Sequence, residues 1–245
     1  MKKLKFFATL SVAAAMLFLA SCNSGDDKKT DETVTDSSTV QTETPPPPAA
    51  NPSGPTSLMV VKFKVANYAK WKAAYEGNDS IRLANGLHKY IIARGTEDSN
   101  MVMVAARMDD VNKAKELAAS AGLKERMKKS GVVGTPTFDF LEAVMNDTTA
   151  ITQTVRLMVN HKVKDWDAWK KVFDGHKQAR IDAGLTDRAL AHTVGDNHSV
   201  TIVFAASDVA KAKAFAASKD LKDKMDEAGV EGPPGFFYYK IAAKY

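Results

Sequence analysis

Three side chains in the second half of the chain, His161, His176 and Arg180, have the types and spacing for small-molecule chemistry. Residues 156–163 alternate apolar and polar side chains, as a half-buried strand does, so His161 shares a face with Leu157, Val159 and Val163. The next segment repeats large side chains at the spacing of one helical stripe: Trp166, Trp169, Phe173, His176 and Arg180.

Packing of that stripe on that strand would bring the two imidazoles and the guanidinium together in an otherwise apolar pocket. An imidazole there could act as a general base, and Arg180 could hold an anionic or carbonyl oxygen. The alternative is structural: histidines satisfied by neighbouring groups and an arginine that extends along the helix end to solvent. No assignment of a catalytic residue follows from the sequence.

The sequence contains two copies of the elements that position these side chains. A shift of 98 residues aligns Trp71 with Trp169 without a gap over residues 58–144, and roughly 28 of the 87 paired positions are identical. Repeat 1 therefore covers residues 57–144 and repeat 2 covers residues 155–245, with a linker at 145–154.

Each repeat predicts the element order β-α-β-β-α-β. In repeat 1 the strands are expected at 58–65, 88–94, 101–107 and 137–144, and in repeat 2 at 156–163, 186–193, 199–205 and 235–242. The helices are expected from Asn67 to Gly86 and from Asp110 to Gly131 with a break at Ser120, and at the matching positions of repeat 2. Residues 232–235, Gly-Pro-Pro-Gly, predict a turn before the last strand.

This order is the ferredoxin-like arrangement, an α+β class, in which helices cover one face of a four-stranded antiparallel sheet. The other face still carries apolar residues and needs a cover, which a second copy in the same chain can provide. The sequence therefore predicts two tandem ferredoxin-like repeats that form a closed barrel within one chain, and hence a monomer with an internal pseudo-dimer.

Several motifs resemble the dimeric α+β barrel superfamily, which includes the antibiotic-biosynthesis-monooxygenase-like proteins. They are Val163-x-Asp-Trp-x-x-Trp-Lys-x-x-Phe-Asp-x-His, the later Asp-Val-x-x-Ala-x-x-Phe, and Ala-Gly-Val-x-Gly-Pro-Pro near residue 230. The resemblance implies that small molecules bind between a sheet and its own helices. The candidate ligand-binding residues are accordingly His161, Trp169, Phe173, His176 and Arg180, with repeat 1 carrying Phe63, Asn78 and Arg82 at the polar positions.

The N-terminal residues are typical of a targeting signal. A basic start and a short apolar run, residues 6–20, end in Leu-Ala-Ser-Cys, and this segment resembles a bacterial lipoprotein signal peptide over residues 1–21 with lipidation at Cys22. Asn23 after the cysteine favours the outer membrane. Residues 22–56 lack apolar periodicity and include a run of four prolines, which predicts a disordered tether behind the lipidated end. We therefore expect a lipid-anchored protein of the cell envelope, on the periplasmic or the surface side.

Composition excludes several classes of protein. The formal net charge is +5, but Lys2, Lys3 and Lys5 supply three of these charges, so the mature chain is close to neutral and no nucleic-acid partner is expected. The single cysteine excludes an intrachain disulfide, no motif for a metal site or a nucleotide cofactor is present, and no cofactor is expected.

Three functions remain open from the sequence. The first is a lipid-anchored protein whose barrel binds a small apolar or aromatic molecule. The second is a cofactor-independent, monooxygenase-like enzyme. The third is a structural or interaction module whose pockets are filled by side chains. A cavity between sheet and helices favours the first two, and a filled core favours the third.

Overall fold

The computed structural model describes residues 56–245. Repeat 1 contains β1 (Thr56–Val65), α1 (Tyr68–Gly77), α2 (Asp79–Ala84), β2 (Leu87–Gly95), β3 (Met101–Met108), α3 (Val111–Ala119), α4 (Ala121–Lys129) and β4 (Val132–Asn146). Repeat 2 contains β5 (Val155–Val163), α5 (Trp166–Gly175), α6 (Lys177–Asp182), β6 (Leu185–Thr193), β7 (Asp196–Ala206), α7 (Val209–Ala216), α8 (Lys219–Glu227) and β8 (Val230–Lys244). The strand and helix order predicted from the sequence is confirmed.

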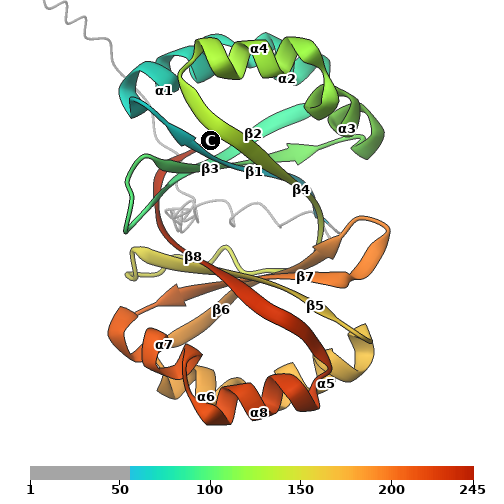
Figure 1. Cartoon of the computed structure of the whole chain (residues 1–245), viewed down its shortest axis with the longest axis vertical. Helices are drawn as coiled ribbons and strands as arrows, with labels where there is room; N and C mark the ends of the chain where they lie inside the picture. The colour runs from blue at the N-terminus through green and yellow to red at the C-terminus, as the bar shows by residue number, and fades with distance from the viewer. Residues whose placement is uncertain (1–55) are drawn as a thin grey trace, which may run out of the picture. The chain divides into compact units, whose positions relative to one another are not determined.

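The eight strands form one closed barrel in the order β1-β3-β2-β8-β5-β7-β6-β4. Each repeat contributes a ferredoxin-like sheet, and the two sheets face each other with α1–α4 on one outer side and α5–α8 on the other (Figure 1). The predicted α+β class and intramolecular barrel are therefore the architecture of the protein.

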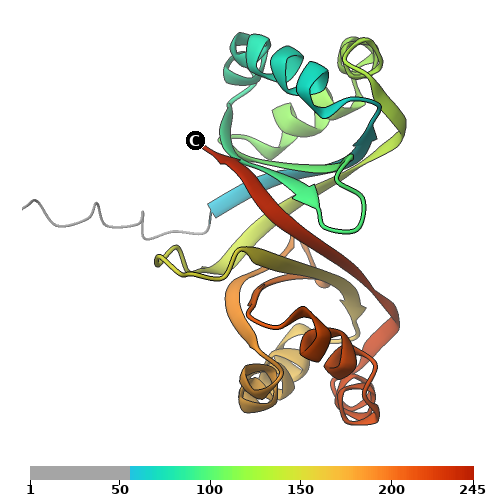
Figure 2. The same ribbon diagram turned by 90° about the vertical axis from the view of Figure 1, so that its left-hand side faces the viewer.

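The last strand of each repeat closes the barrel by pairing with the other repeat. Strand β4 pairs with β1 and then, from Leu141 to Asn146, with β6. Strand β8 pairs with β5 and then, from Tyr239 to Lys244, with β2. Figure 2 shows β8 running from the second repeat into the first. Both strands are 15 residues long, so each has enough length to serve two sheets.

Three apolar clusters hold the layers together. The first two lie between a sheet and its own helices, around Trp71 in repeat 1 and Trp169 in repeat 2. The third lies between the sheets and combines both repeats: Val60, Ala93, Met103, Ala105, Leu141, Ala143, Met158, Ala191 and Tyr239. Because the third cluster draws on both repeats, neither repeat covers its sheet alone.

The helix starts follow the sequence, but the first helix of each repeat is shorter than expected. Asn67 and Asp165 cap their helices by accepting bonds from the backbone N–H groups of Lys70 (2.9 Å) and Ala168 (2.7 Å). The helix then breaks at Asn78 in repeat 1 and at His176 in repeat 2. The prediction of one continuous helix over this segment was wrong, because His176 lies at the junction of α5 and α6.

The segment Gly232–Gly235 differs from its predicted turn. It lies inside β8, where the strand bulges between the pairs Asn160–Gly235 and Lys162–Glu231. Proline has no N–H group for the ladder, so strands accommodate it at such bulges. The bulge lies opposite His161, the one residue of β5 between those pairs.

No helix between residues 56 and 245 has the length and apolar character needed to cross a bilayer. The predicted signal peptide, Cys22 and tether lie outside the described residues.

Cutting the chain between Asp147 and Thr154 tests the internal barrel. Each half would expose the sheet face that the other half now covers and an unpaired part of β4 or β8. We expect the separate halves to form homodimers or aggregates in light scattering, and the co-expressed halves to assemble one to one. Two halves that each stay monomeric and soluble would contradict the intramolecular barrel.

Candidate functional site

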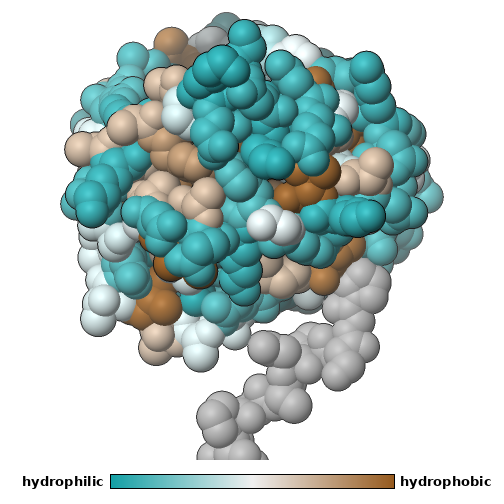
Figure 3. Space-filling model, turned by 90° about the horizontal axis from the view of Figure 1, so that it is seen from below, coloured by the Kyte–Doolittle hydropathy of each residue, from teal (hydrophilic) through white to brown (hydrophobic). Residues whose placement is uncertain are grey.

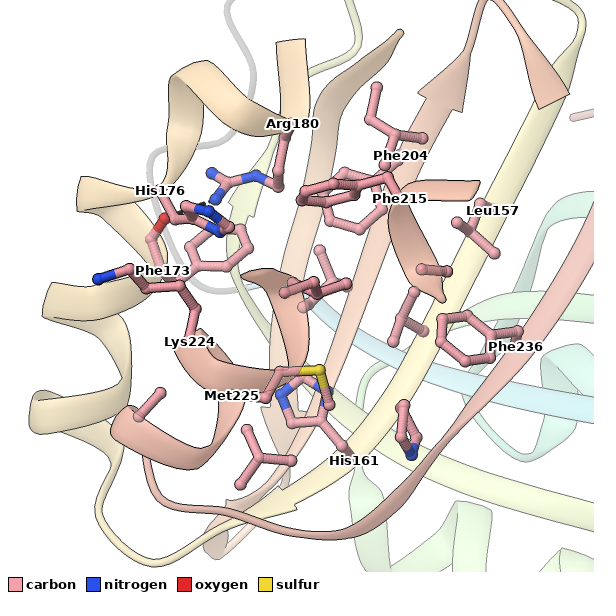
Figure 4. Close-up of a pocket in the computed structure, with 18 of the residues that line it drawn as sticks. Leu157, His161, Phe173, His176, Arg180, Phe204, Phe215, Lys224, Met225 and Phe236 are labelled. Atoms are coloured by element: carbon pink, nitrogen blue, oxygen red, sulfur yellow. Dashed lines mark hydrogen bonds between the residues drawn. The ribbon is translucent and has the colours of Figure 1, made fainter. Parts of the chain in front are cut away.

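A cavity of about 90 Å³ lies in repeat 2 between the sheet and helices α5–α8. Its wall includes all five residues predicted from the sequence: His161, Trp169, Phe173, His176 and Arg180. The remaining wall is mainly apolar and includes Leu157, Phe204, Phe215, Met225 and Phe236 (Figure 4). The strand and helix faces therefore meet as the residue spacing predicted.

His161 is the polar group in this wall that has no hydrogen-bond partner. Both ring nitrogens are buried, and neither has a partner among residues 56–245. Burial lowers the pKa of His161 to about 4, because the charged imidazolium would lose its hydration without gaining a counter-ion. The ring is therefore neutral near pH 7 and carries one free donor and one free acceptor.

Aromatic packing fixes the orientation of the His161 ring. Its centroid lies 5.5 Å from that of Trp169, tilted by 60°. Trp169 in turn stacks on Phe173 with centroids 5.0 Å apart. Strand alternation on β5 and the helical spacing of α5 thus place one imidazole against a two-ring aromatic wall.

His176 differs from His161 because it is already paired. Its Nε2 lies 3.1 Å from Oδ2 of Asp220, in the first turn of α8, and its ring packs on Phe215. The contact joins the α5–α6 junction to α8 at the edge of the cavity. His176 is better placed to hold this edge than to bind a ligand alone.

Arg180 is also satisfied by the protein, which corrects its proposed role. Its Nε and Nη2 donate to both carboxylate oxygens of Asp187, at 3.0 Å and 2.9 Å, and its Nη1 donates to the carbonyl of Phe173. The guanidinium also lies 3.7 Å from the centre of the Phe173 ring. A side chain that is 4% exposed and bonded in this way holds α6 to β6, and it is not free to receive an anionic oxygen.

A matching cavity in repeat 1 was not predicted from the sequence. It measures about 110 Å³ and is lined by Phe63, Trp71, Tyr75, Asn78 and Arg82 among others. The Tyr75 hydroxyl and Arg82 Nε are buried without a partner among residues 56–245, and burial raises the pKa of Tyr75 to about 12. Of the five such atoms in the described chain, four belong to residues that line these two cavities.

The repeat 1 cavity could have been predicted from a difference between the two repeats, in which the polar and the aromatic side chain exchange places. Repeat 2 has a histidine on the strand and Phe173 on the helix, whereas repeat 1 has Phe63 on the strand and Tyr75 on the helix. Each cavity therefore keeps one uncharged polar group among aromatic rings, supplied from opposite walls. A comparison of the histidines alone does not show this, because the polar group of repeat 1 is a tyrosine.

Metal binding finds no support among residues 56–245, where no three His, Cys, Asp or Glu side chains gather as ligands would.

Comparison with known proteins supports the fold. No protein-family model matches the sequence, and no curated protein matches it. The crystal structure of an anthrone oxidase-like protein is similar with a TM-score of 0.51 and 13% identity, over 78% of this chain and 92% of that one. A proposed monooxygenase from Fusobacterium nucleatum is similar with a TM-score of 0.50 and 10% identity, over 78% and 94%. At such identities the likeness confirms the dimeric α+β barrel fold and carries no function with it.

The neutral state of His161 predicts how stability depends on pH. In the unfolded chain His161 takes up a proton as the pH falls through its ordinary pKa of about 6.5, whereas the folded protein resists it until about 4. Between these two pKa values the unfolded state therefore binds more protons than the folded state. As the pH is lowered through this window, the free energy of unfolding decreases by about 3 kcal/mol in total. His161→Phe, which imports the residue of position 63, should remove this component in urea unfolding between pH 7 and pH 4. Equal pH slopes in both proteins would contradict a buried, unpaired imidazole.

Proposed function

We propose that the repeat 2 cavity binds a small, neutral, apolar or aromatic molecule that hydrogen-bonds to His161. One observation carries the proposal: both nitrogens of a buried imidazole lack a partner and line a cavity whose wall is otherwise mainly apolar. Buried polar groups are normally paired, because each unpaired group costs about 1–3 kcal/mol. A bound molecule with a polar group would supply the missing bond.

The size of the cavity limits the ligand. An apolar cavity of about 150 Å³ takes benzene, and this one measures about 90 Å³. A one-ring ligand therefore exceeds the enclosed space and has to extend partly out of the cavity towards solvent. The outer face over the helices is largely hydrophilic, with hydrophobic patches between the hydrophilic side chains (Figure 3). Ile181 of α6 is one of the exposed apolar residues of this repeat.

The charge of the cavity favours an uncharged ligand. His161 is neutral, and the charges of the other two cations in the wall, Arg180 and Lys224, are balanced by Asp187 and Glu227. An anion would therefore meet no unpaired cation there. Transfer of an ion into an apolar wall is costly without such a partner. A phenol or a carbonyl compound fits, because a hydroxyl or carbonyl oxygen can bond to the neutral imidazole.

Catalysis in the same cavity is the second candidate. The structurally similar proteins named as an anthrone oxidase-like protein and a proposed monooxygenase favour it, since both share this fold. A histidine whose pKa is held near 4 is, however, a weak general base at neutral pH, where a base near 7 works best. Binding is therefore the function that the geometry supports better. An enzyme would show turnover of an electron-rich phenol under oxygen without added cofactor.

Phenol and benzene form a matched probe pair for the site. The parent should bind phenol more tightly than benzene by about 1–3 kcal/mol, the cost of leaving a buried polar group without a partner. The variant His161→Phe with His176→Asn should lose this preference and keep its fold, because repeat 1 tolerates those residues. Calorimetric titration measures the affinities, and the melting temperature controls for folding.

The control is the reciprocal variant, Phe63→His with Asn78→His. It leaves repeat 2 untouched, so the phenol affinity of the parent site should persist. A first double variant that binds phenol as well as the parent would show that the two histidines are structural.

We also propose that the barrel is attached to a membrane of the cell envelope through lipid at Cys22. The support is the sequence: a short apolar run ends in the only cysteine of the chain. Several acyl chains would give a durable anchor.

Replacement of Cys22 by serine tests the anchor. Each buried methylene of an acyl chain contributes about 0.8 kcal/mol, so loss of the lipid should release the protein from the membrane fraction without detergent. Mass spectrometry of the parent should show the lipid mass at Cys22. Unchanged fractionation of Cys22→Ser, with release by detergent only, would rule out lipidation as the attachment.

A further inference from the structure

A third cavity, of about 400 Å³, lies inside the barrel between the two sheets. It is lined by residues from all eight strands and shares none with the two cavities beneath the helices. Its volume is within the range of small-molecule sites. We refer to it as the lumen.

The two repeats contribute equivalent positions to the lumen. Nine pairs related by the 98-residue shift line it together: 58/156, 60/158, 90/188, 91/189, 103/201, 105/203, 141/239, 143/241 and 146/244. The pseudo-two-fold axis therefore runs through the lumen. Beyond Val60 and Met158, the equivalent residues Lys62 and Asn160 touch each other, with Nζ 3.4 Å from Oδ1. A polar contact between the two repeats therefore lies at this end of the lumen.

The opposite end of the lumen is rich in positive charge. Arg107, Arg156, Arg188 and Lys244 line it, against a single carboxylate, that of Asp147. Asp147 pairs with Arg188 at 2.7 Å. No carboxylate among residues 56–245 lies within 4.0 Å of the other three cations, as the ion pairs of the described chain show.

The arginines are held in place by groups that do not neutralise them. Arg156 donates from Nη1 to the carbonyls of Gln153 (2.6 Å) and Val155 (3.2 Å). Arg107 stacks on the ring of Tyr90 at 4.4 Å. Partial burial and the nearby charge of Arg188 both lower the pKa of Arg156, so an uncompensated charge is retained at this end at a cost.

Folding does not require these charges at these places. The positions equivalent to Arg156 and Arg188 in repeat 1 are Leu58 and Tyr90, and the position equivalent to Arg107 in repeat 2 is Ala205. The same strands therefore form with neutral residues in the other copy. Arg107 and Lys244 are exposed, so water can solvate their charges, whereas Arg156 is half-buried. The half-buried charge of Arg156 is therefore the one that the barrel architecture does not explain.

The rest of the lumen wall is mostly apolar. Val60, Ile91, Met103, Met158, Val203 and Ile241 line it together with two tyrosines. We propose that the lumen binds an alkyl chain that ends in a carboxylate, with the chain against these residues and the carboxylate at Arg156 and Arg107. A carboxylate matches the planar donor fork of arginine and would compensate the unpaired charge.

Decanoate and decanol are the probes, titrated into the full-length protein by calorimetry below their aggregation concentrations. We expect one saturable decanoate site per chain and at least about tenfold weaker binding of decanol, because the alcohol leaves the arginines unpaired. Raising the salt concentration should weaken decanoate binding and leave decanol binding nearly unchanged.

Variants that import the residue of the other repeat locate the site. Arg156→Leu and Arg107→Ala should each weaken decanoate about tenfold without affecting decanol. The charge-matched control, Lys113→Ala on the exposed face of α3, also removes one positive charge and should leave both affinities unchanged. The melting temperature reports folding, and Arg156→Gln replaces Arg156→Leu if the latter is destabilised.

Three results would overturn the proposal. They are the absence of saturable decanoate binding, equal affinities for decanoate and decanol, and loss of decanoate binding in His161→Phe but not in Arg156→Leu. The last result would assign the carboxylate to the cavity beneath the helices instead.

Discussion

Each sheet of this protein has two apolar faces, and its own helices cover only one of them. The exposed face would carry residues such as Val60, Met103, Met158 and Tyr239, all of which are buried between the sheets. Removal of that face from water is the constraint that joins the two repeats. It also explains the length of β4 and β8. Each of these strands continues from its own sheet to pair with a strand of the other sheet, and this pairing fixes how the two sheets face each other.

The same two-faced sheet creates separate chemical environments on opposite sides of one strand. Along β5, His161 and its neighbours at alternate positions face the helices, whereas Arg156, Met158 and Asn160 face the other sheet. Because the period of a strand is two, a single segment supplies a neutral imidazole to one cavity and a cation to another. The helix side contains neutral or internally balanced groups, and the lumen contains unbalanced positive charge. The two sides therefore differ in the charge that they would present to a bound molecule.

Local patterns in the sequence were enough for the fold, but not for the contacts of the site. The repeat, the capping residues and the strand alternation predicted the element order and the wall that contains His161, because each depends on neighbours within a few positions. The pairing of Arg180 with Asp187 joins a helix to a bulged strand, and nothing in the spacing shows which carboxylate an arginine will meet. Two long-range features, the bulge of β8 opposite His161 and the cavity around Tyr75, were missed for the same reason.

The duplication separates the demands of folding from those of binding. Trp71 and Trp169 are the same in both repeats and occupy equivalent places in the two apolar clusters, so both repeats need this side chain for their core. Arg82 and Arg180 are also shared, yet one pairs with Asp79 on its own helix and the other with Asp187 on a strand, so a shared residue does not imply a shared contact. Positions that differ are more informative. A barrel that forms with leucine at position 58 does not need arginine at position 156 to fold, so the partly buried charge there is a difference between the repeats that folding does not require.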